Sequence, residues 1–329
     1  MKKRIKKQKF PVIGILILIL VFVFCIILFF PNQTRRALSF ARNAGLDIAS
    51  VILSHNFRTL AQIQSHYNAT SPNSSKVRVL IVPGHEPNYG GAEFGNLKER
   101  DMNVELGQDL QRFLSVDPHF EVFITRDSNG WNPEFASYFQ NNWNDISQWM
   151  KASHDEFSHL VSIGEVAHTY STIIHNKAPL DVATRLYGIT KWSNENNMDI
   201  VIHVHFNDNP RKNTSKAGDY SDFAMYVPAS QYGNSTTTKT IAGNIFNRLK
   251  MYNPVSDFPG ESNGVIDEPS LIAIGSNNTS DAASLLIEYR YIYEPQLQDP
   301  KTRSVTLNNL AYATYLGLQD FFDQNSSVN

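Results

Sequence analysis

Two histidines and two glutamates, far apart in the sequence, carry side chains that could together perform hydrolysis. His85 and His205 each lie where an apolar run typical of a buried strand ends, and Glu288 closes a third such run. Glu99 begins a stretch with helical periodicity. Two imidazoles and one carboxylate suit a catalytic zinc, which keeps one coordination position for water. A second carboxylate that does not bind the metal could act as the base, so the pattern indicates a hydrolase.

Alternating strand and helix patterns predict the scaffold that must position these four residues. Helical spacing of apolar residues predicts helices at 99–114, 180–196, 237–251 and 303–322. Apolar runs predict strands at 77–82, 121–125, 199–205, 223–227, 271–274 and 283–288. Such alternation is typical of an α/β fold, so we expect a mainly parallel, twisted sheet flanked by helices. Functional groups gather at the carboxyl ends of the strands in such sheets, where His85, His205 and Glu288 are all expected.

The N-terminus predicts a transmembrane helix that anchors the chain. Residues 1–9 are rich in lysine and arginine, and residues 10–30 form an uncharged, apolar run. About 20 apolar residues span the hydrocarbon core of a bilayer. The excess of basic residues before the run places the N-terminus in the cytoplasm and the rest of the chain outside. A cleaved signal peptide is the alternative and leads to the same compartment, but no small-residue cleavage pattern follows Phe30.

The remaining chain divides into a stalk and a folded domain. Residues 31–66 have a helical pattern, and residues 68–75 are turn-rich and polar. We expect 31–75 to form a stalk helix and linker that packs on the domain or on a second copy, which would give a homodimer. The folded domain is expected at 76–329. Residues 128–180 fit the alternation poorly and predict an insertion packed on the domain, with a lid over the site as one role.

Composition excludes two kinds of partner or site. The net charge is −2 at pH 7, and no basic run interleaved with aromatics follows residue 9, so we expect no nucleic-acid partner. Cys25 is the single cysteine and lies in the apolar N-terminal run. A disulfide within the monomer and a cysteine-based metal site are therefore excluded.

Six short motifs occur in order along the chain. They are a strand followed by Pro-Gly-His at 82–85, a Glu-x-Asp-x-Asn helix start at 99–103, a strand ending in Thr-Arg at 125–126, Arg185 in the helix before the third strand, His-x-Asn at 205–207 and a strand ending in Glu288. Together they resemble the motifs of the zinc-dependent N-acetylmuramoyl-L-alanine amidases of the type-3 amidase family. The resemblance spans residues 77–322, nearly the whole expected domain.

This resemblance implies that His85, Glu99 and His205 bind zinc and that Glu288 is the catalytic carboxylate. It also implies the reaction, which is hydrolysis of the amide between the lactyl group of N-acetylmuramic acid and L-alanine of the stem peptide in peptidoglycan. Zinc lowers the pKa of bound water to about 7 and polarises the scissile carbonyl. Glu288 would take the water proton and pass it to the leaving nitrogen.

The chain departs from the family pattern at two places. The family commonly has Ser-x-His before its third ligand, whereas this chain has His203 two residues before His205. Residues two apart on a strand face the same side, so His203 is a further candidate for contact with the metal. After Glu288 the family often has Gly-Phe, but residues 289–291 are Tyr-Arg-Tyr. With the insertion, this departure leaves two alternatives: a non-catalytic peptidoglycan-binding or regulatory module, and an amidase acting on another cell-surface amide.

Overall fold

A computed structural model describes residues 55–69, 75–164, 166, 178–209, 211 and 213–326. The chain divides into two units, and the second, Phe57–Asn329, contains almost all of these residues. It begins ahead of the boundary near Lys76 that the polar linker suggests. Within the described ranges, no helix has the length and apolar character needed to cross a bilayer. The anchor expected at residues 10–30 lies outside these ranges.

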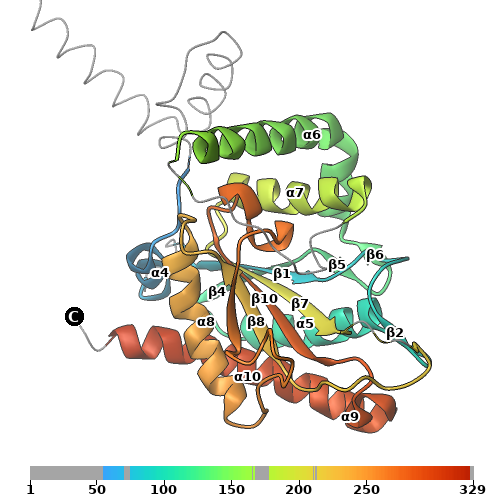
Figure 1. Cartoon of the computed structure of the whole chain (residues 1–329). Coiled ribbons are helices and arrows are strands. Elements are labelled where there is room, and N and C mark those ends of the chain that lie inside the picture. Colours follow the sequence, from blue (N-terminus) through green and yellow to red (C-terminus); the bar gives the residue numbers. More distant parts are fainter. Residues whose placement is uncertain are drawn as a thin grey trace, which may run out of the picture. The chain divides into compact units, whose positions relative to one another are not determined.

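A six-stranded sheet forms the centre of this unit (Figure 1). Its order is β4-β1-β7-β10-β8-β9. The first four strands are parallel, β8 runs antiparallel to β10, and β9 is parallel to β8. The α/β fold with a mainly parallel sheet is therefore confirmed. In sheet order, the strands are Phe120–Ile124, Val77–Pro83, Ile200–Asn207, Ala283–Tyr291, Ala224–Pro228 and Val265–Glu268.

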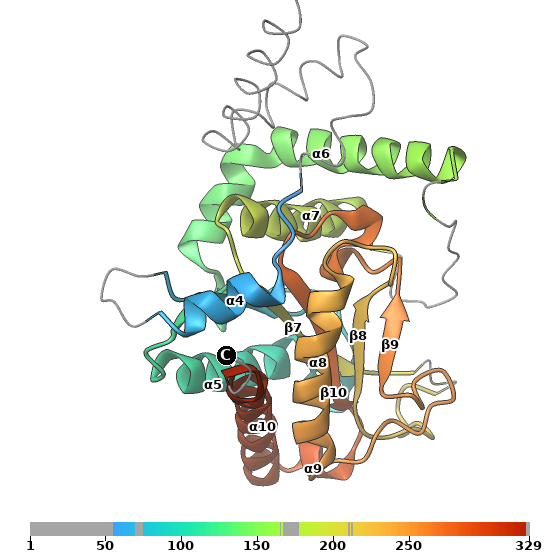
Figure 2. The same cartoon turned by 90° about the vertical axis from the view of Figure 1, so that its left-hand side faces the viewer.

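Helices cover both faces of the sheet (Figures 1 and 2), which explains why its central strands are apolar on both sides. One face packs against α5 (Glu99–Ser115), α8 (Ser235–Lys250) and α10 (Pro300–Ser326), and this layer holds the larger hydrophobic core. The other face packs against α7 (Leu180–Glu195). The short elements are the hairpin strands β2 (Glu93–Phe94) and β3 (Leu97–Lys98), the hairpin strands β5 (Arg126–Asp127) and β6 (Gly130–Trp131), helix α9 (Pro295–Gln298), and the 3-10 helices η2 (Ile272–Ile274) and η3 (Ser276–Asn278).

Helix α4 (Leu60–Tyr67) is the first helix of this unit, and it packs at the amino ends of the strands. Its Ile63 is fully buried in the larger core. Asp199, immediately before β7, is buried and lies 3.4 Å from Nε of Arg58 and 3.0 Å from Nδ1 of His66. The part of the expected stalk that the structure describes therefore packs on its own domain.

The expected insertion contains one long helix, α6 (Pro133–Ser162). Asn132 caps its first turn, and Pro133 suits the first helical position because that residue needs no hydrogen-bonded N–H. Phe135, Phe139 and Ile146 are buried and belong to the core that α6 shares with α7. Figure 1 shows α6 on the side of α7 that faces away from the sheet. Residues 165 and 167–177 are outside the described part, so the lid stays a prediction.

The prediction of a strand at 271–274 is wrong, because this segment contains the 3-10 helix η2. A four-residue apolar run has too few positions to show a period, and Gly275, with φ of 92°, ends the turn. The sixth strand is instead β9, with the sequence Val-Ile-Asp-Glu. It lies at an edge of the sheet, where charged side chains reach solvent, and therefore lacks the apolar signal of a central strand.

Candidate metal centre

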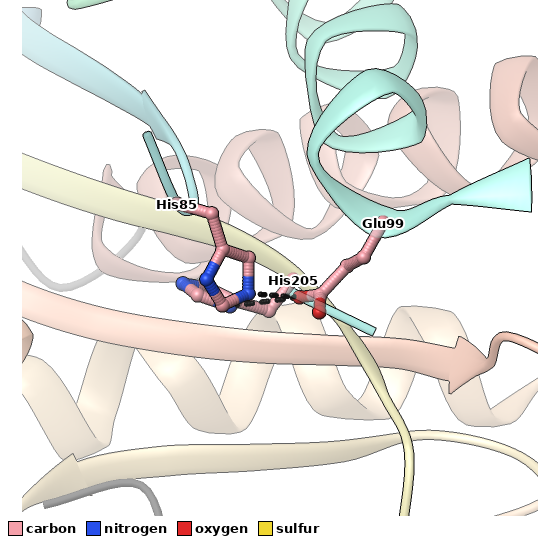
Figure 3. Close-up of side chains that lie close together, drawn as sticks. All are labelled: His85, Glu99 and His205. Atoms are coloured by element: carbon pink, nitrogen blue, oxygen red, sulfur yellow. Dashed lines mark hydrogen bonds and ion pairs between the residues drawn. The ribbon is translucent and has the colours of Figure 1, made fainter. Parts of the chain in front are cut away.

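The structure brings His85, Glu99 and His205 together at the carboxyl edge of the sheet, with their side chains pointing toward one another (Figure 3). One ligand atom from each residue lies within 4.8 Å of the other two. Nε2 of His85 is 2.8 Å and Nδ1 of His205 is 3.0 Å from the same Glu99 oxygen, Oε1. The three residues come from the end of β1, the first turn of α5 and β7, which are the elements that the sequence predicts.

The carboxylate of Glu99 is buried, and hydrogen bonds hold both of its oxygens in place. Its Oε1 accepts the N–H of Phe206 at 3.1 Å, and its Oε2 accepts the N–H of Ala92 at 2.8 Å. Burial alone would raise the pKa of Glu99, but the two imidazoles of His85 and His205 hold this pKa well below its ordinary value. The carboxylate is therefore an anion at neutral pH, as a metal ligand must be.

The backbone around His85 is tightly constrained. His85 has a φ of 67°, in the left-handed region that costs a non-glycine residue about 1–2 kcal/mol. A Cβ on Gly84 would lie 2.2 Å from Nε2 of His205, and one on Gly91 would lie 2.7 Å from Cδ2 of His85. Strain of this kind persists where the surrounding structure enforces it, often at functional sites. Both glycines are needed to let the two imidazoles approach the chain so closely.

Arg126 joins the two backbone segments that carry His85 and Glu99. The side chain is buried, and its guanidinium donates to the carbonyl oxygens of Pro83 at 3.1 Å, Arg100 at 2.9 Å and Gly84. Burial lowers the pKa of Arg126 to about 10, so the group remains a cation at neutral pH. The Thr-Arg motif therefore fixes the end of β1 relative to the first turn of α5. The sequence shows the motif but not these contacts.

Glu288 lies on β10, where the strand register pairs it with His205 of β7. It is buried, and its Oε2 has no hydrogen-bond partner among the described residues. Burial, followed by the negative charges of Glu99 and Glu261, raises the pKa of Glu288 well above its ordinary value. A carboxyl group with a raised pKa accepts a proton more readily than an ordinary carboxylate, which suits a group that both accepts and returns a proton.

The residues that follow Glu288 lie outside the cleft. The two tyrosines of 289–291 are fully buried in the larger core, and Arg290 forms an ion pair with Glu294 at 2.8 Å. None of the three is among the described residues that line the cleft. Arg290 is therefore committed elsewhere, and the departure from the family pattern does not change the wall of the substrate pocket.

A cleft of about 440 Å³ contains all four residues. His203 lines it but does not belong to the group of three ligand residues. Its ring is buried, and Nδ1 has no hydrogen-bond partner among the described residues. Burial lowers the pKa of His203 to about 3, so the ring is neutral. The structure therefore places His203 in the cleft wall beside the candidate metal centre.

A polar cluster at the rim of the cleft is absent from the sequence predictions. Arg185 of α7 donates to Glu86 at 2.7 Å, to the hydroxyl of Tyr89 at 2.8 Å and to Asp181 at 2.5 Å. The four-residue spacing of Asp181 and Arg185 is a signal for a pair on one helix face. The contact with Glu86 joins residues that are 99 positions apart, and no local pattern predicts it. Together, the fold and the site place a candidate metal centre at the carboxyl edge of an α/β sheet, an arrangement that suits a hydrolase.

Comparison with known proteins identifies the family. The model of the N-acetylmuramoyl-L-alanine amidase family matches residues 79–320, so the chain belongs to this family. It is therefore an N-acetylmuramoyl-L-alanine amidase, and the family membership predicted from the six motifs is confirmed.

Several solved structures are similar to the chain at low sequence identity. Ami1 of Mycobacterium smegmatis is 12% identical, with 76% of this chain and 100% of that chain covered and a TM-score of 0.49. The amidase CwlD of Clostridioides difficile, solved with the GerS lipoprotein, is 15% identical, with 75% and 99% covered and a TM-score of 0.47. An amidase from Clostridium difficile 630 is 16% identical, with 76% and 98% covered and a TM-score of 0.46. A search of curated proteins found no match.

Proposed function

We propose that the chain is a zinc-dependent amidase that hydrolyses the bond between N-acetylmuramic acid and L-alanine of the stem peptide. Membership of the family supplies the substrate class. The observation that carries the proposal is the convergence of His85, Glu99 and His205 within 4.8 Å, in the same cleft as Glu288.

The donor set fits zinc. Imidazole nitrogens and carboxylate oxygens are ordinary zinc ligands, with bonds of about 2.0–2.2 Å. The nitrogens of His85 and His205 already approach one oxygen of Glu99 at 2.8 and 3.0 Å, so a small separation of these atoms would admit an ion. Three protein ligands leave a coordination position for water, as in other catalytic sites. When bound, zinc supplies a water with a pKa of about 7 and polarises the scissile carbonyl.

Glu288 is the group that moves the proton. It takes a proton from the attacking water as the new carbon–oxygen bond forms, and it returns this proton to the nitrogen as the carbon–nitrogen bond breaks. The products are a lactyl carboxylate on the glycan and a free amino group on L-alanine. The raised pKa of Glu288 supports this role, because a carboxyl group with an ordinary pKa would return the proton poorly near neutral pH.

We also propose that residues 10–30 anchor the chain in the cytoplasmic membrane, with the amidase domain outside. The basic residues that precede this apolar run support the orientation. Arg58 donates its backbone N–H to Asp281, just before β10, so the chain enters the compact unit at the amino ends of the strands. The candidate metal centre is at the carboxyl ends of the strands, on the opposite edge of the sheet. A homodimer would use the stalk before Phe57, because α4 packs on its own domain.

The test uses the full-length protein in detergent. We expect one zinc per chain, and we expect digested cell-wall sacculi to release stem peptides and leave unsubstituted muramic acid. Mass analysis that finds muramic acid still bound to alanine, with another bond cut, would assign the enzyme to a different amide.

Glu288→Gln should keep the zinc and lose at least about 100-fold in turnover, the usual size of an acid–base contribution. Glu121→Gln is the matched control, because Glu121 is a half-exposed carboxylate that pairs with Arg78. Full turnover by Glu288→Gln would refute the role of this residue.

A further inference from the structure

Glu261 is a buried carboxylate that contacts the strands of the site, although it is not one of the described residues that line the cleft. Its Oε1 accepts hydrogen bonds from Nδ2 of Asn207 and from the hydroxyl of Tyr226, both at 2.7 Å. Its Oε2 accepts from the hydroxyls of Ser256 at 2.6 Å and Tyr291 at 2.9 Å. A carboxylate offers about four lone-pair positions, and these donors occupy them all. Glu261 therefore holds its neighbours and has no capacity left to act on a substrate.

The backbone of Glu261 is fixed by the turn that leads into β9. Its N–H donates to the carbonyl oxygen of Phe258 at 2.8 Å, and its own carbonyl oxygen accepts from Gly264 at 2.7 Å. The carbonyl oxygen of Gly264 in turn accepts from Met225 of β8 at 2.8 Å. A carboxylate on a turn that is bonded to the sheet can set the positions of the groups that it contacts.

Three of the four donors come from neighbouring strands of the sheet. Asn207 is the last residue of β7, Tyr291 is the last residue of β10, and Tyr226 lies within β8. Strand β10 lies between β7 and β8. Because β7 carries His205 and β10 carries Glu288, one side chain joins the strand of a candidate metal ligand to the strand of the candidate catalytic carboxylate.

The pairing of β10 with β7 is irregular directly after Glu288. Glu288 pairs with His205, and the next pair is Tyr291 with Asn207, so three steps along β10 match two steps along β7. An extra residue of this kind is a β-bulge, which interrupts the ladder and changes the direction of nearby side chains. Glu261 bonds both members of the second pair, and it therefore reinforces the register on the far side of the bulge.

Tyr226 lies beside Glu288 in the wall of the cleft. It pairs with Leu286, and side chains two residues apart on a strand, such as Leu286 and Glu288, face the same side. Burial, followed by the negative charge of Glu261, raises the pKa of Tyr226 far above its ordinary value, so the hydroxyl keeps the proton that it donates to Glu261. Within the described ranges, Oε2 of Glu288 has no hydrogen-bond partner. The position of this oxygen therefore depends on the backbone of β10 and on neighbours such as Tyr226.

We propose that Glu261 is a positioning residue, which holds Glu288 beside the candidate metal centre through hydrogen bonds to the ends of β7 and β10 and to β8. This proposal rests on the proposed function, because Glu288 is the group that moves the proton there. Without these bonds the strand beyond the bulge can shift, and a displacement of about 1 Å at a catalytic group can lower the rate by about 100-fold. Tyr291 belongs to the segment that departs from the family pattern, so this segment supports the site from outside the cleft.

The experiment measures kcat and KM per zinc-loaded chain of the full-length enzyme on a soluble synthetic muramoyl peptide. Glu261→Ala should lower kcat by about tenfold or more and change KM by less than about twofold, because the displaced group acts in the chemical step. Glu261→Gln should keep kcat within about threefold of the wild type. Its carboxamide oxygen can accept from Asn207 and Tyr226, and its NH2 group can donate to the two remaining hydroxyls.

A double-mutant cycle distinguishes positioning of Glu288 from a general loss of structure. In Glu288→Gln the group that Glu261 positions is already disabled, so adding Glu261→Ala should lower the residual kcat by less than about twofold. Asp117→Ala is the matched control, because Asp117 is a buried carboxylate that accepts from the N–H of His119 at 3.0 Å and lies just before β4, at the opposite edge of the sheet. It should lower the free energy of unfolding and leave kcat unchanged.

The outcomes separate this inference from the proposed function. Wild-type kcat in Glu261→Ala, or an equal loss when Glu261→Ala is added to Glu288→Gln, would overturn the positioning role and leave the amidase activity intact. A loss in Glu261→Gln as large as in Glu261→Ala would overturn the role of the hydrogen bonds. A wild-type enzyme that does not cleave between the lactyl group and alanine would overturn the proposed function and this inference with it.

Tyr291→Phe provides the decision if Glu261→Ala does not fold. This substitution removes one donor to Glu261 from outside the cleft and keeps the buried ring. We expect kcat to fall by about threefold, roughly the effect of a single hydrogen bond, with no fall when the substitution is added to Glu288→Gln. Wild-type kcat in Tyr291→Phe would overturn the proposal.

Discussion

Replacement of Gly84 by alanine should displace His205 from the candidate metal centre. The new Cβ would lie 2.2 Å from Nε2 and 2.3 Å from Cε1 of the His205 ring. Ordinary contacts between such atoms are about 3.5 Å, so one of the two groups must move by about 1 Å. The backbone of Gly84 cannot retreat easily, because its N–H donates to Val204 at 2.9 Å and its carbonyl oxygen accepts from Arg126. The imidazole must therefore move, and it is held at 3.0 Å from Glu99 only in its present position.

A displacement of this size at a metal ligand should reduce zinc affinity by about 10- to 100-fold, the scale on which changes in ligand orientation act at metal sites. Competition with a chromophoric chelator measures this affinity directly, and thermal unfolding of the metal-free protein reports the separate cost of overpacking, about 1–3 kcal/mol. Gly243→Ala in α8 is the control, because a Cβ there meets no atom within 4 Å. It should leave zinc affinity unchanged. If Gly84→Ala bound zinc as tightly as the wild type, the geometry assigned to His205 would be incorrect.

Three further predictions concern the parts that support the site. The pKa of Glu288 is raised in the folded protein, whereas in the unfolded chain it has the ordinary value of 4.5. The unfolded chain therefore loses this proton at a lower pH than the folded protein, and the stability that Glu288 contributes falls as pH rises through the folded-state pKa. Metal-free Glu288→Gln should therefore be more stable than the wild type by about 1 kcal/mol or more at pH 8, with a smaller difference at pH 5 in denaturant titrations; an equal difference at both values would contradict the raised pKa. Arg126→Lys should weaken zinc binding by about 10- to 100-fold, because an ammonium cannot bond all three carbonyl groups, and unchanged affinity would show that the contacts do not position the ligands. Ile63→Ala should destabilise the domain by about 2–5 kcal/mol in equilibrium unfolding, whereas a loss below 0.5 kcal/mol would show that α4 contributes little to the fold.

The sequence predicts the positions of His85, Glu99, His205 and Glu288 because each one follows or begins a strongly patterned element. Parallel strands with alternating helices place their carboxyl ends at one edge, so residues at those ends converge whatever their separation in the chain. This topology makes the candidate site the most predictable part of the fold. Periodicity similarly predicts α5, α7, α8 and α10, whose apolar faces are buried against the sheet.

Other features depend on contacts that local patterns do not encode. The ion pair between Glu86 and Arg185 and the three carbonyl contacts of Arg126 each join segments brought together only by the tertiary fold. The edge strand β9 lacks an apolar run because one side of the strand has no neighbour, and η2 resembles a strand because a buried turn can be equally apolar. Glu86, Arg185 and the segment that contains η2 line the cleft, so this part of its wall and rim is less visible in the sequence than the four central residues.

X-ray absorption at the zinc edge of the loaded, full-length protein tests the central claim most directly, because this method counts the imidazoles bound to the metal. We expect two imidazoles with oxygen ligands in the wild type, and one imidazole in His205→Ala. A third imidazole in the wild type would bring His203 into the coordination sphere, and a spectrum of the wild type without imidazole would contradict the metal centre built from His85, Glu99 and His205.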